Sequence, residues 1–178
     1  EALLRWSHPE RGLVSPATFI PVAEEIGLIG ALGDWVLHEA CRTAAGWPKA
    51  IRVGVNLSPL QVGKARFALD VVGALQHARL DPHRLDLEIT ESALLARDLA
   101  TRTTLHDLHD FGVRLSLDDF GTGFSSLAAL RWFPFDTLKI DMSFVSDLDV
   151  DADSTAIVRA VIGLARDLGI KTVAEGVE

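Results

Sequence analysis

The 178-residue sequence has almost no cysteine, no long apolar run and an excess of acidic residues. Its one cysteine, Cys41, excludes an internal disulfide and suits a reducing compartment. The longest apolar stretch, residues 26–32, is too short to span a bilayer, and no signal-peptide pattern is present. A formal net charge of −8 argues against broad binding to DNA or to anionic membranes. These features predict a cytoplasmic segment, either on its own or within a larger, membrane-attached protein.

Strand and helix patterns alternate along the whole chain. Alternating apolar residues predict strands at 51–57, 84–90, 113–118, 135–141 and 170–175, with the end of another at 1–6. Helical spacing predicts helices at 16–26, 28–45, 66–78, 98–110, 127–132 and 154–168. Ser15 and Pro16 are typical of a helix start. This rhythm indicates a parallel α/β fold, but both a doubly wound sheet and a (β/α)₈ barrel fit it.

The predicted strands end in polar side chains. These are Glu1, Asn56, Glu88, the pair Asp118 and Asp119, Lys139 with Asp141, and Glu175. A (β/α)₈ barrel collects its active-site residues from the carboxyl ends of several strands. A doubly wound sheet gathers them at one switch point, commonly beside a glycine-rich first turn, and no G-x-G-x-x-G follows an early strand here. The sequence therefore predicts a barrel-type α/β fold.

The polar strand ends share one kind of chemistry. Their carboxylate and amide oxygens suit Mg²⁺ or Mn²⁺ better than a softer metal. Clustered acids cannot all stay ionised without cations to offset their repulsion. Two adjacent aspartates can divide their oxygens between two metal ions, as in hydrolases that act on phosphate esters. Lys139 could hold a nucleophilic water or offset charge on a phosphate.

Each of these residues also has a plainer interpretation. Asp118 and Asp119 could form a solvated strand end, and Asn56 could start a turn. Lys139 could be a surface lysine whose stem is packed. Arg5 could pair with a neighbouring acid, and Asp141 could cap the next segment or bridge to Lys139.

Six segments together carry a specific resemblance. They are residues 1–5 (EALLR), 56–58 (NLS), 88–91 (EITE), 118–123 (DDFGTG), 139–141 (KID) and 175–178 (EGVE). In order and spacing they resemble the successive signatures of EAL-domain cyclic-di-GMP phosphodiesterases. The resemblance covers the whole chain.

The resemblance implies a TIM-like (β/α)₈ barrel variant with one antiparallel strand. It also implies hydrolysis of cyclic di-GMP to linear pGpG with Mg²⁺ or Mn²⁺, two ions in all. One ion would be held by Glu1, Asn56, Glu88 and Asp118, and the other by Asp118, Asp119 and Glu175. Glu175 is also the candidate general base, and Lys139 would orient the attacking water.

Further roles follow from the same resemblance. Arg5 would meet a substrate phosphate, and Leu3 would lie against a guanine. Glu91 would hold the loop at residues 121–126, Glu178 would brace it, and Asp141 would lie close behind the ligands. That loop would couple the metal site to a homodimer contact.

The chain departs from the family pattern at both ends. The family's first strand and its C-terminal end are absent, so residues 1–178 are expected to form part of one longer domain, with sensory or GGDEF-type domains outside it. Phe124 stands where tyrosine is common. A rival hypothesis is a receptor that binds cyclic di-GMP without cleaving it. Such relatives usually lack ligand residues, and none is lost here.

Overall fold

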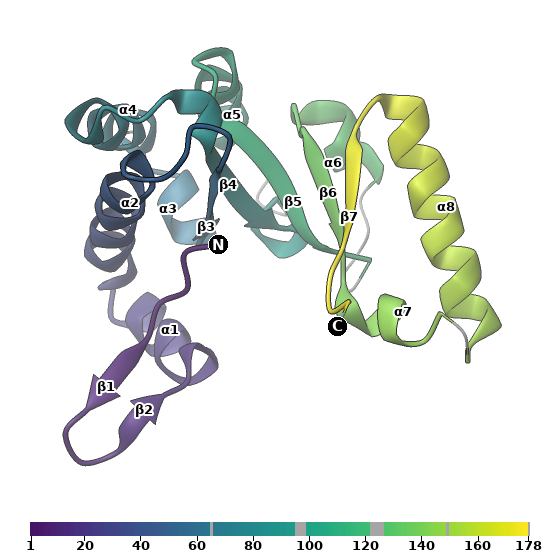
Figure 1. Cartoon of the computed structure of the whole chain (residues 1–178), viewed down its shortest axis with the longest axis horizontal. Helices are drawn as coiled ribbons and strands as arrows, with labels where there is room; N and C mark the ends of the chain where they lie inside the picture. Colours follow the sequence, from purple (N-terminus) through teal and green to yellow (C-terminus); the bar gives the residue numbers. More distant parts are fainter. Residues whose placement is uncertain (65, 95–98, 122–126, 149, 178) are drawn as a thin grey trace.

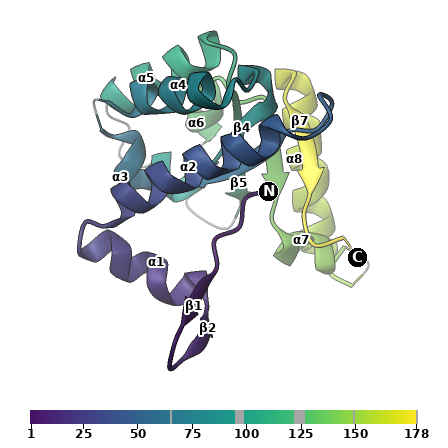
Figure 2. The ribbon, with the colours of Figure 1, turned by 60° about the vertical axis from the view of Figure 1, so that its left-hand side comes forward.

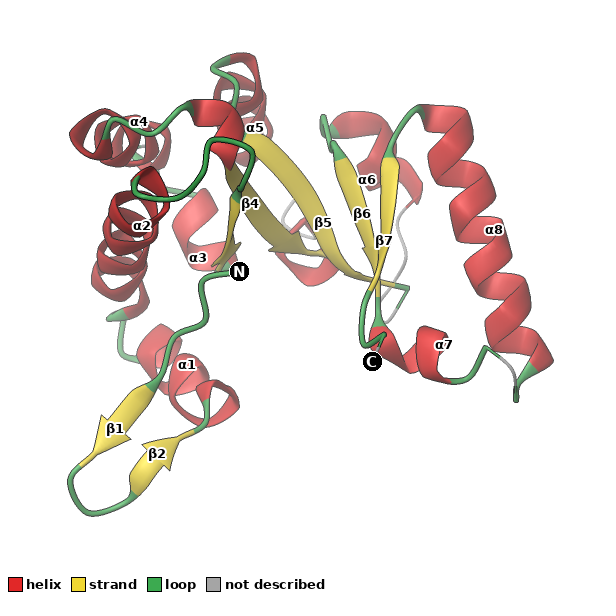
Figure 3. Ribbon diagram, in the orientation of Figure 1, coloured by secondary structure: helices red, strands yellow, loops and turns green. Residues whose placement is uncertain are grey.

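Strands and helices follow one another along the chain from strand β1 to strand β7 (Figures 1 and 3). The structure, a computed structural model, describes residues 1–64, 66–94, 99–121, 127–148 and 150–177. The strands are β1 (Trp6–His8), β2 (Gly12–Val14), β3 (Val53–Leu57), β4 (Leu85–Thr90), β5 (Arg114–Phe120), β6 (Thr137–Ile140) and β7 (Lys171–Ala174). The helices are α1 (Pro16–Glu25), α2 (Ile29–Ala45), α3 (Pro59–Val62), α4 (Phe67–Ala78), α5 (Leu99–Asp110), α6 (Leu127–Trp132), α7 (Met142–Ser146) and α8 (Ala152–Leu168), with 3₁₀ turns η1 (Pro82–Arg84) and η2 (Glu91–Leu94).

Five strands form one parallel sheet in the order β3-β4-β5-β6-β7. Consecutive strands are neighbours, as in a barrel wall, so their carboxyl ends all lie at one edge. The parallel α/β architecture predicted from the strand and helix pattern is confirmed. The antiparallel strand implied by the resemblance is not among these five strands.

The two faces of the sheet differ in chemistry. Outward side chains such as Leu87, Leu117 and Leu138 are fully buried in the main hydrophobic core. Helices α2 and α4 flank the β3 end of the sheet, and α8 flanks the β7 end (Figure 1). Because side chains alternate along a strand, the residue next to each of these leucines points to the opposite, inner face. The polar strand-end residues gather on that inner face.

The buried side chain of Arg84, directly before β4, links the amino end of that strand to the end of α2 and the segment after it. Arg84 donates hydrogen bonds to the backbone oxygens of Ile51 at 2.8 Å and Ala44 at 2.7 Å, and a longer one to that of Trp47 at 3.5 Å. It is 9% exposed, so these carbonyl groups satisfy a charge that is otherwise removed from water.

The N-terminal region differs from the prediction. Within residues 1–5, only Ala2 forms a β-bridge, pairing in parallel with Val55, and Trp6 begins the separate strand β1. Strands β1 and β2 form a short antiparallel hairpin that, with α1, extends away from the sheet (Figure 2). Ser15 is the N-cap residue of α1, but its side chain makes no capping hydrogen bond.

Two further predicted boundaries were wrong, and one short helix was missed. Strand β5 continues two residues past Asp118, to Phe120. Helix α7 was not predicted, and α8 begins at Ala152 because Asp151 caps it. Among the described residues, no helix is long and apolar enough to cross a membrane.

Candidate active site

Lys139 lies at the centre of the polar inner face. Its Nζ is 2.7 Å from Glu88 Oε2, 3.0 Å from Asp118 Oδ1 and 2.8 Å from Glu175 Oε1. Strand β5 separates β4 from β6, so the contact between Glu88 and Lys139 spans a neighbouring strand on the concave side of the sheet. The interpretation of Lys139 as a packed surface lysine is therefore wrong.

Burial and charge act together on these groups. Burial by itself would lower the pKa of Lys139, but hydrogen bonds to Glu175, Glu88 and Asp118 outweigh it and raise the pKa above its usual value. Burial raises the pKa of Glu88, and the Lys139 ammonium only partly opposes this shift. The cluster thus holds more negative charge than one lysine balances, which favours binding of a further cation.

The Asp118 and Asp119 side chains converge because the backbone of β5 is irregular. In a regular strand, successive side chains point to opposite faces. Here the pairing of β5 with β6 shifts register between Leu117 and Phe120, and Asp119 has a φ of +53°. A bulge of this kind re-aims a side chain. Asp119 N also donates to Asp118 Oδ1 at 3.1 Å. A carboxylate oxygen of Asp119 lies within 4.8 Å of one from Asp118, so the two side chains converge.

Three acids lie close enough together to hold a divalent cation. Asp118, Asp119 and Glu175 each offer one carboxylate oxygen, and these oxygens lie within 4.8 Å of one another. Burial, and then repulsion from Asp118, Asp141 and Glu175, raises the pKa of Asp119. An all-oxygen, acid-rich donor set fits Mg²⁺ or Mn²⁺. This group matches the second of the two predicted ligand sets.

The first predicted ligand set lies beside it. Asn56 Nδ2 donates to Glu1 Oε1 at 2.5 Å, which joins residues 55 positions apart. Asn56 is also the register partner of Glu88 across β3 and β4. Within the part of the chain that the structure describes, Glu1 and Glu88 stand outside the three-acid group, and Glu88 is bonded to Lys139 instead.

The sequence prediction missed Gly54, which makes room for Glu88. A Cβ on Gly54 would lie 2.1 Å from Glu88 Oε1 and 3.8 Å from Glu1 Cγ. Glycine inside a strand often marks such a close approach, and that signal was present in the alternating pattern of residues 51–57.

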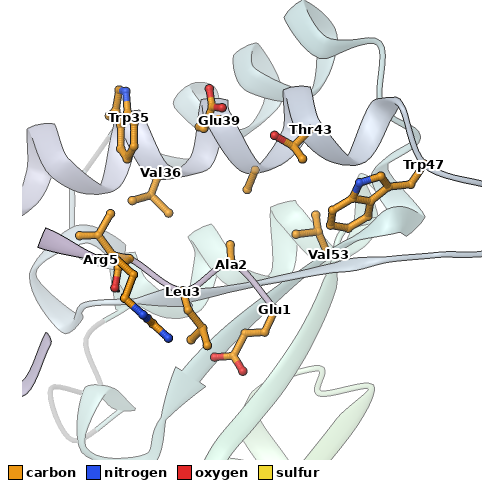
Figure 4. A pocket seen from close by; sticks show the side chains of 12 residues that line it. Glu1, Ala2, Leu3, Arg5, Trp35, Val36, Glu39, Thr43, Trp47 and Val53 are labelled. Atoms are coloured by element: carbon orange, nitrogen blue, oxygen red, sulfur yellow. The ribbon is translucent and has the colours of Figure 1, made fainter. Parts of the chain in front are cut away.

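Leu3 and Arg5 line two cavities beside the N-terminal segment. Figure 4 shows Glu1, Leu3 and Arg5 extending from the N-terminal segment on the side away from Trp35 and Glu39 of α2. Between that segment and α2 lies a cavity of about 290 Å³. A second cavity, of about 460 Å³, is lined by Leu3 and Arg5 together with Asn56, Glu24 and Thr90. Arg5 donates to the Leu4 carbonyl oxygen at 2.9 Å.

The remaining predicted residues have mixed outcomes. Asp141 caps α7, accepting a hydrogen bond from Ser143 N at 2.9 Å, as one of its two interpretations proposed. Glu91 is 5% exposed at the start of η2. Glu178, Phe124 and most of the predicted loop lie outside the described residues.

Comparison with known proteins gives the family. Residues 1–178 match the EAL domain, so the chain belongs to the EAL domain family. An uncharacterized protein of Sinorhizobium fredii is 55% identical over all of this chain, which spans 22% of that relative. The bifunctional diguanylate cyclase/cyclic di-GMP phosphodiesterase MucR of Pseudomonas aeruginosa is 46% identical over all of this chain, which spans 27% of MucR.

Solved structures agree in fold. The PaMucR phosphodiesterase, in a complex with c-di-GMP, superposes with a TM-score of 0.92 and 46% identity, covering 99% of this chain and 73% of the other. The match confirms the TIM-barrel-like α/β fold expected from the strand-end residues. The chain itself spans about a quarter of the curated relatives, so activity is argued separately below.

Proposed function

We propose that this chain carries the catalytic centre of a metal-dependent phosphodiesterase that hydrolyses cyclic di-GMP to linear pGpG. The observation that most strongly supports this proposal is the cluster of Glu88, Asp118 and Glu175 around Lys139, with Asp119 close to the same acids. No acid of the set is replaced by a neutral residue. Support comes from membership of the EAL family and from the similarity to MucR.

The reaction adds water across one phosphodiester linkage. A P–O bond forms to the water oxygen, and the P–O3′ bond breaks, leaving a 5′-phosphate on the linear product. One proton leaves the water, and one is delivered to the 3′-oxygen. A bound Mg²⁺ or Mn²⁺ would supply Lewis-acid charge at the scissile phosphate.

The chain's own residues divide the remaining work. Asp118, Asp119 and Glu175 would hold one metal ion, and Glu1, Asn56 and Glu88 would hold the other together with Asp118. Glu175 would accept the proton from water, and this role is supported by its closeness to Lys139 and to the other two acids. Lys139 would orient the water and limit repulsion between the acids and the phosphate.

The cavity beside Asn56 fits the rest of the nucleotide. Leu3 is 56% exposed and offers an apolar surface for a purine ring, and the Arg5 guanidinium can pair with the second phosphate. Holding the non-reacting half of the substrate fixes the scissile linkage over the acids.

The test is product formation with a matched variant. Protein incubated with cyclic di-GMP and Mn²⁺ is expected to release pGpG, and EDTA is expected to abolish this. Asp118→Asn keeps the shape but removes the charge, and should lower turnover by at least about 100-fold. Asp110→Asn, at the exposed end of α5, is the control and should leave turnover unchanged. Nucleotide binding without any turnover would instead support the receptor hypothesis.

A further inference from the structure

Three backbone positions beside the acids have left-handed conformations. Asp119 has a φ of +53°, Gly121 of +100° and Gly176 of +69°. For a residue with a side chain, this region costs about 1–2 kcal/mol. Asp119 therefore keeps its orientation only if neighbouring parts of the structure hold the turn in place.

Helix α7 packs against both of the segments that present these acids. A Cβ on Gly121 would lie 2.9 Å from Phe144 Cε2 and 3.4 Å from Phe144 Cζ, so the Phe144 ring rests against the backbone two residues after Asp119. A Cβ on Gly176 would lie 2.7 Å from Met142 Cβ, so α7 also abuts the residue after Glu175. One short helix thus contacts the chain on either side of the three-acid group.

Helix α7 is itself fixed in place. Asp141 caps its first turn through Ser143 N, and the preceding residue, Ile140, accepts a hydrogen bond from Glu175 N at 3.1 Å. Phe144 is half-buried and packs on the main hydrophobic core. The ring therefore links the turn after Asp119 to a rigid part of the fold.

We propose that Phe144 is a positioning residue, which holds the turn at Gly121 so that Asp119 stays aligned with Asp118 and Glu175. This inference rests on the proposed function for its kinetic consequence. Its structural consequence is separate, because alignment of three carboxylates sets the affinity for a divalent ion whether or not a substrate is cleaved.

Phe144→Ala, Phe144→Leu and Phe111→Ala test the inference. Phe111 follows α5 and is 43% exposed, so its truncation removes the same ring away from the acids. For each purified protein, titration calorimetry measures the Mn²⁺ affinity, and steady-state assays with cyclic di-GMP measure kcat and KM. Thermal denaturation shows whether the protein is folded.

Phe144→Ala is expected to weaken Mn²⁺ binding and to lower kcat by about tenfold each, with KM changed less than about twofold. Phe144→Leu keeps an apolar side chain against Gly121 and should recover most of both losses. Phe111→Ala should leave both unchanged. A purely structural role would lower only the melting temperature.

Two results would overturn the inference. One is a folded Phe144→Ala protein with wild-type Mn²⁺ affinity, and the other is a leucine variant as impaired as the alanine variant. If the wild-type protein binds Mn²⁺ but cleaves nothing, the proposed function fails while the affinities still decide the role of Phe144. Absence of any Mn²⁺ binding by the wild-type protein contradicts both.

Discussion

Lys139 Nζ and Glu88 Oε2 lie 2.7 Å apart, although their residues come from strands that are not neighbours in the sheet. Both side chains are about nine-tenths buried, with exposed fractions of 11% and 9%. An ion pair so far removed from water is stable only when further polar partners share it. Here Asp118 and Glu175 complete the set, and its surplus of negative charge could accommodate a metal ion in addition to the lysine.

Replacing Lys139 by methionine is expected to abolish activity and to destabilise the metal-free protein. The methionine side chain keeps the packing of the lysine methylene groups, but Glu88 and Asp118 lose the ammonium group that they share. This loss should cost about 3 kcal/mol in unfolding free energy near neutral pH. Urea denaturation with and without Mn²⁺ measures this loss. Lys171→Met, on the exposed β7 edge, is the control and should stay within about 0.5 kcal/mol of wild type.

The loss of unfolding free energy caused by Lys139→Met should be smaller at acidic pH. Burial raises the folded-state pKa of Glu88, so its protonated form is favoured in the folded protein. A raised carboxyl pKa means that stability falls as the pH rises from the unfolded-state value of about 4.3 through the folded-state value. Denaturation of the variant across this range is expected to show more stability at the acidic end. A loss that is constant with pH would contradict the explanation.

Gly54→Leu is expected to impair the site without unfolding the protein. The added atoms would meet the flexible end of Glu88, so Glu88 must move away from Lys139. Turnover should fall by at least about tenfold, with a smaller effect on melting temperature. In α8, a Cβ on Gly163 would meet nothing within 4 Å. Leucine also has a higher helix propensity than glycine, so Gly163→Leu should keep full activity. Wild-type turnover in Gly54→Leu would refute the role assigned to Gly54.

Arg84→Met should destabilise the protein while leaving the site chemistry intact. The substitution leaves the carbonyl groups of Ile51 and Ala44 without their charged donor, which should cost about 3 kcal/mol. Chemical denaturation gives the loss, and turnover in the absence of denaturant should match wild type. Arg66→Met, at an exposed position before α4, controls for the loss of a positive charge.

Cys41 should be inert towards thiol reagents in the native protein. It is fully buried, and burial raises its pKa to about 11. At about pH 8 only roughly one thiol in a thousand would be ionised, and the reagent cannot reach it. Absorbance with a disulfide reagent is expected to show no reaction until denaturant is added, and then one thiol per chain. Rapid modification of the native protein would contradict the packing of α2.

The polar residues at the ends of the long strands could be predicted from the sequence because the alternating pattern that marks a strand is local. Asn56, Glu88, Asp118 and Lys139 follow runs of alternating apolar residues, and parallel strands bring such ends to one edge. The convergence of Asp118 and Asp119 on one side was implied by the family resemblance, and the alternating strand pattern alone could not predict it. It depends on a left-handed backbone at Asp119, which tertiary contacts impose and no residue type at that position signals.

Short elements were missed for a different reason. Helix α7 and strands β1 and β2 have five, three and three residues, too few to show a helical or alternating period. Helix α8 starts two residues earlier than predicted because Asp151 accepts hydrogen bonds from Asp153 N and Ser154 N, which turns part of an acidic tract into a helix cap. Helix α7 carries Phe144, the proposed positioning residue, so the sequence pattern gave no sign of that role.

The most direct test of the central claim is a single-turnover experiment with protein in excess over cyclic di-GMP and with Mn²⁺ present. Chromatography of the quenched mixture is expected to show complete conversion to pGpG, with none after EDTA treatment or in the Asp118→Asn protein. Full recovery of intact cyclic di-GMP from a folded wild-type protein that binds it would contradict the account.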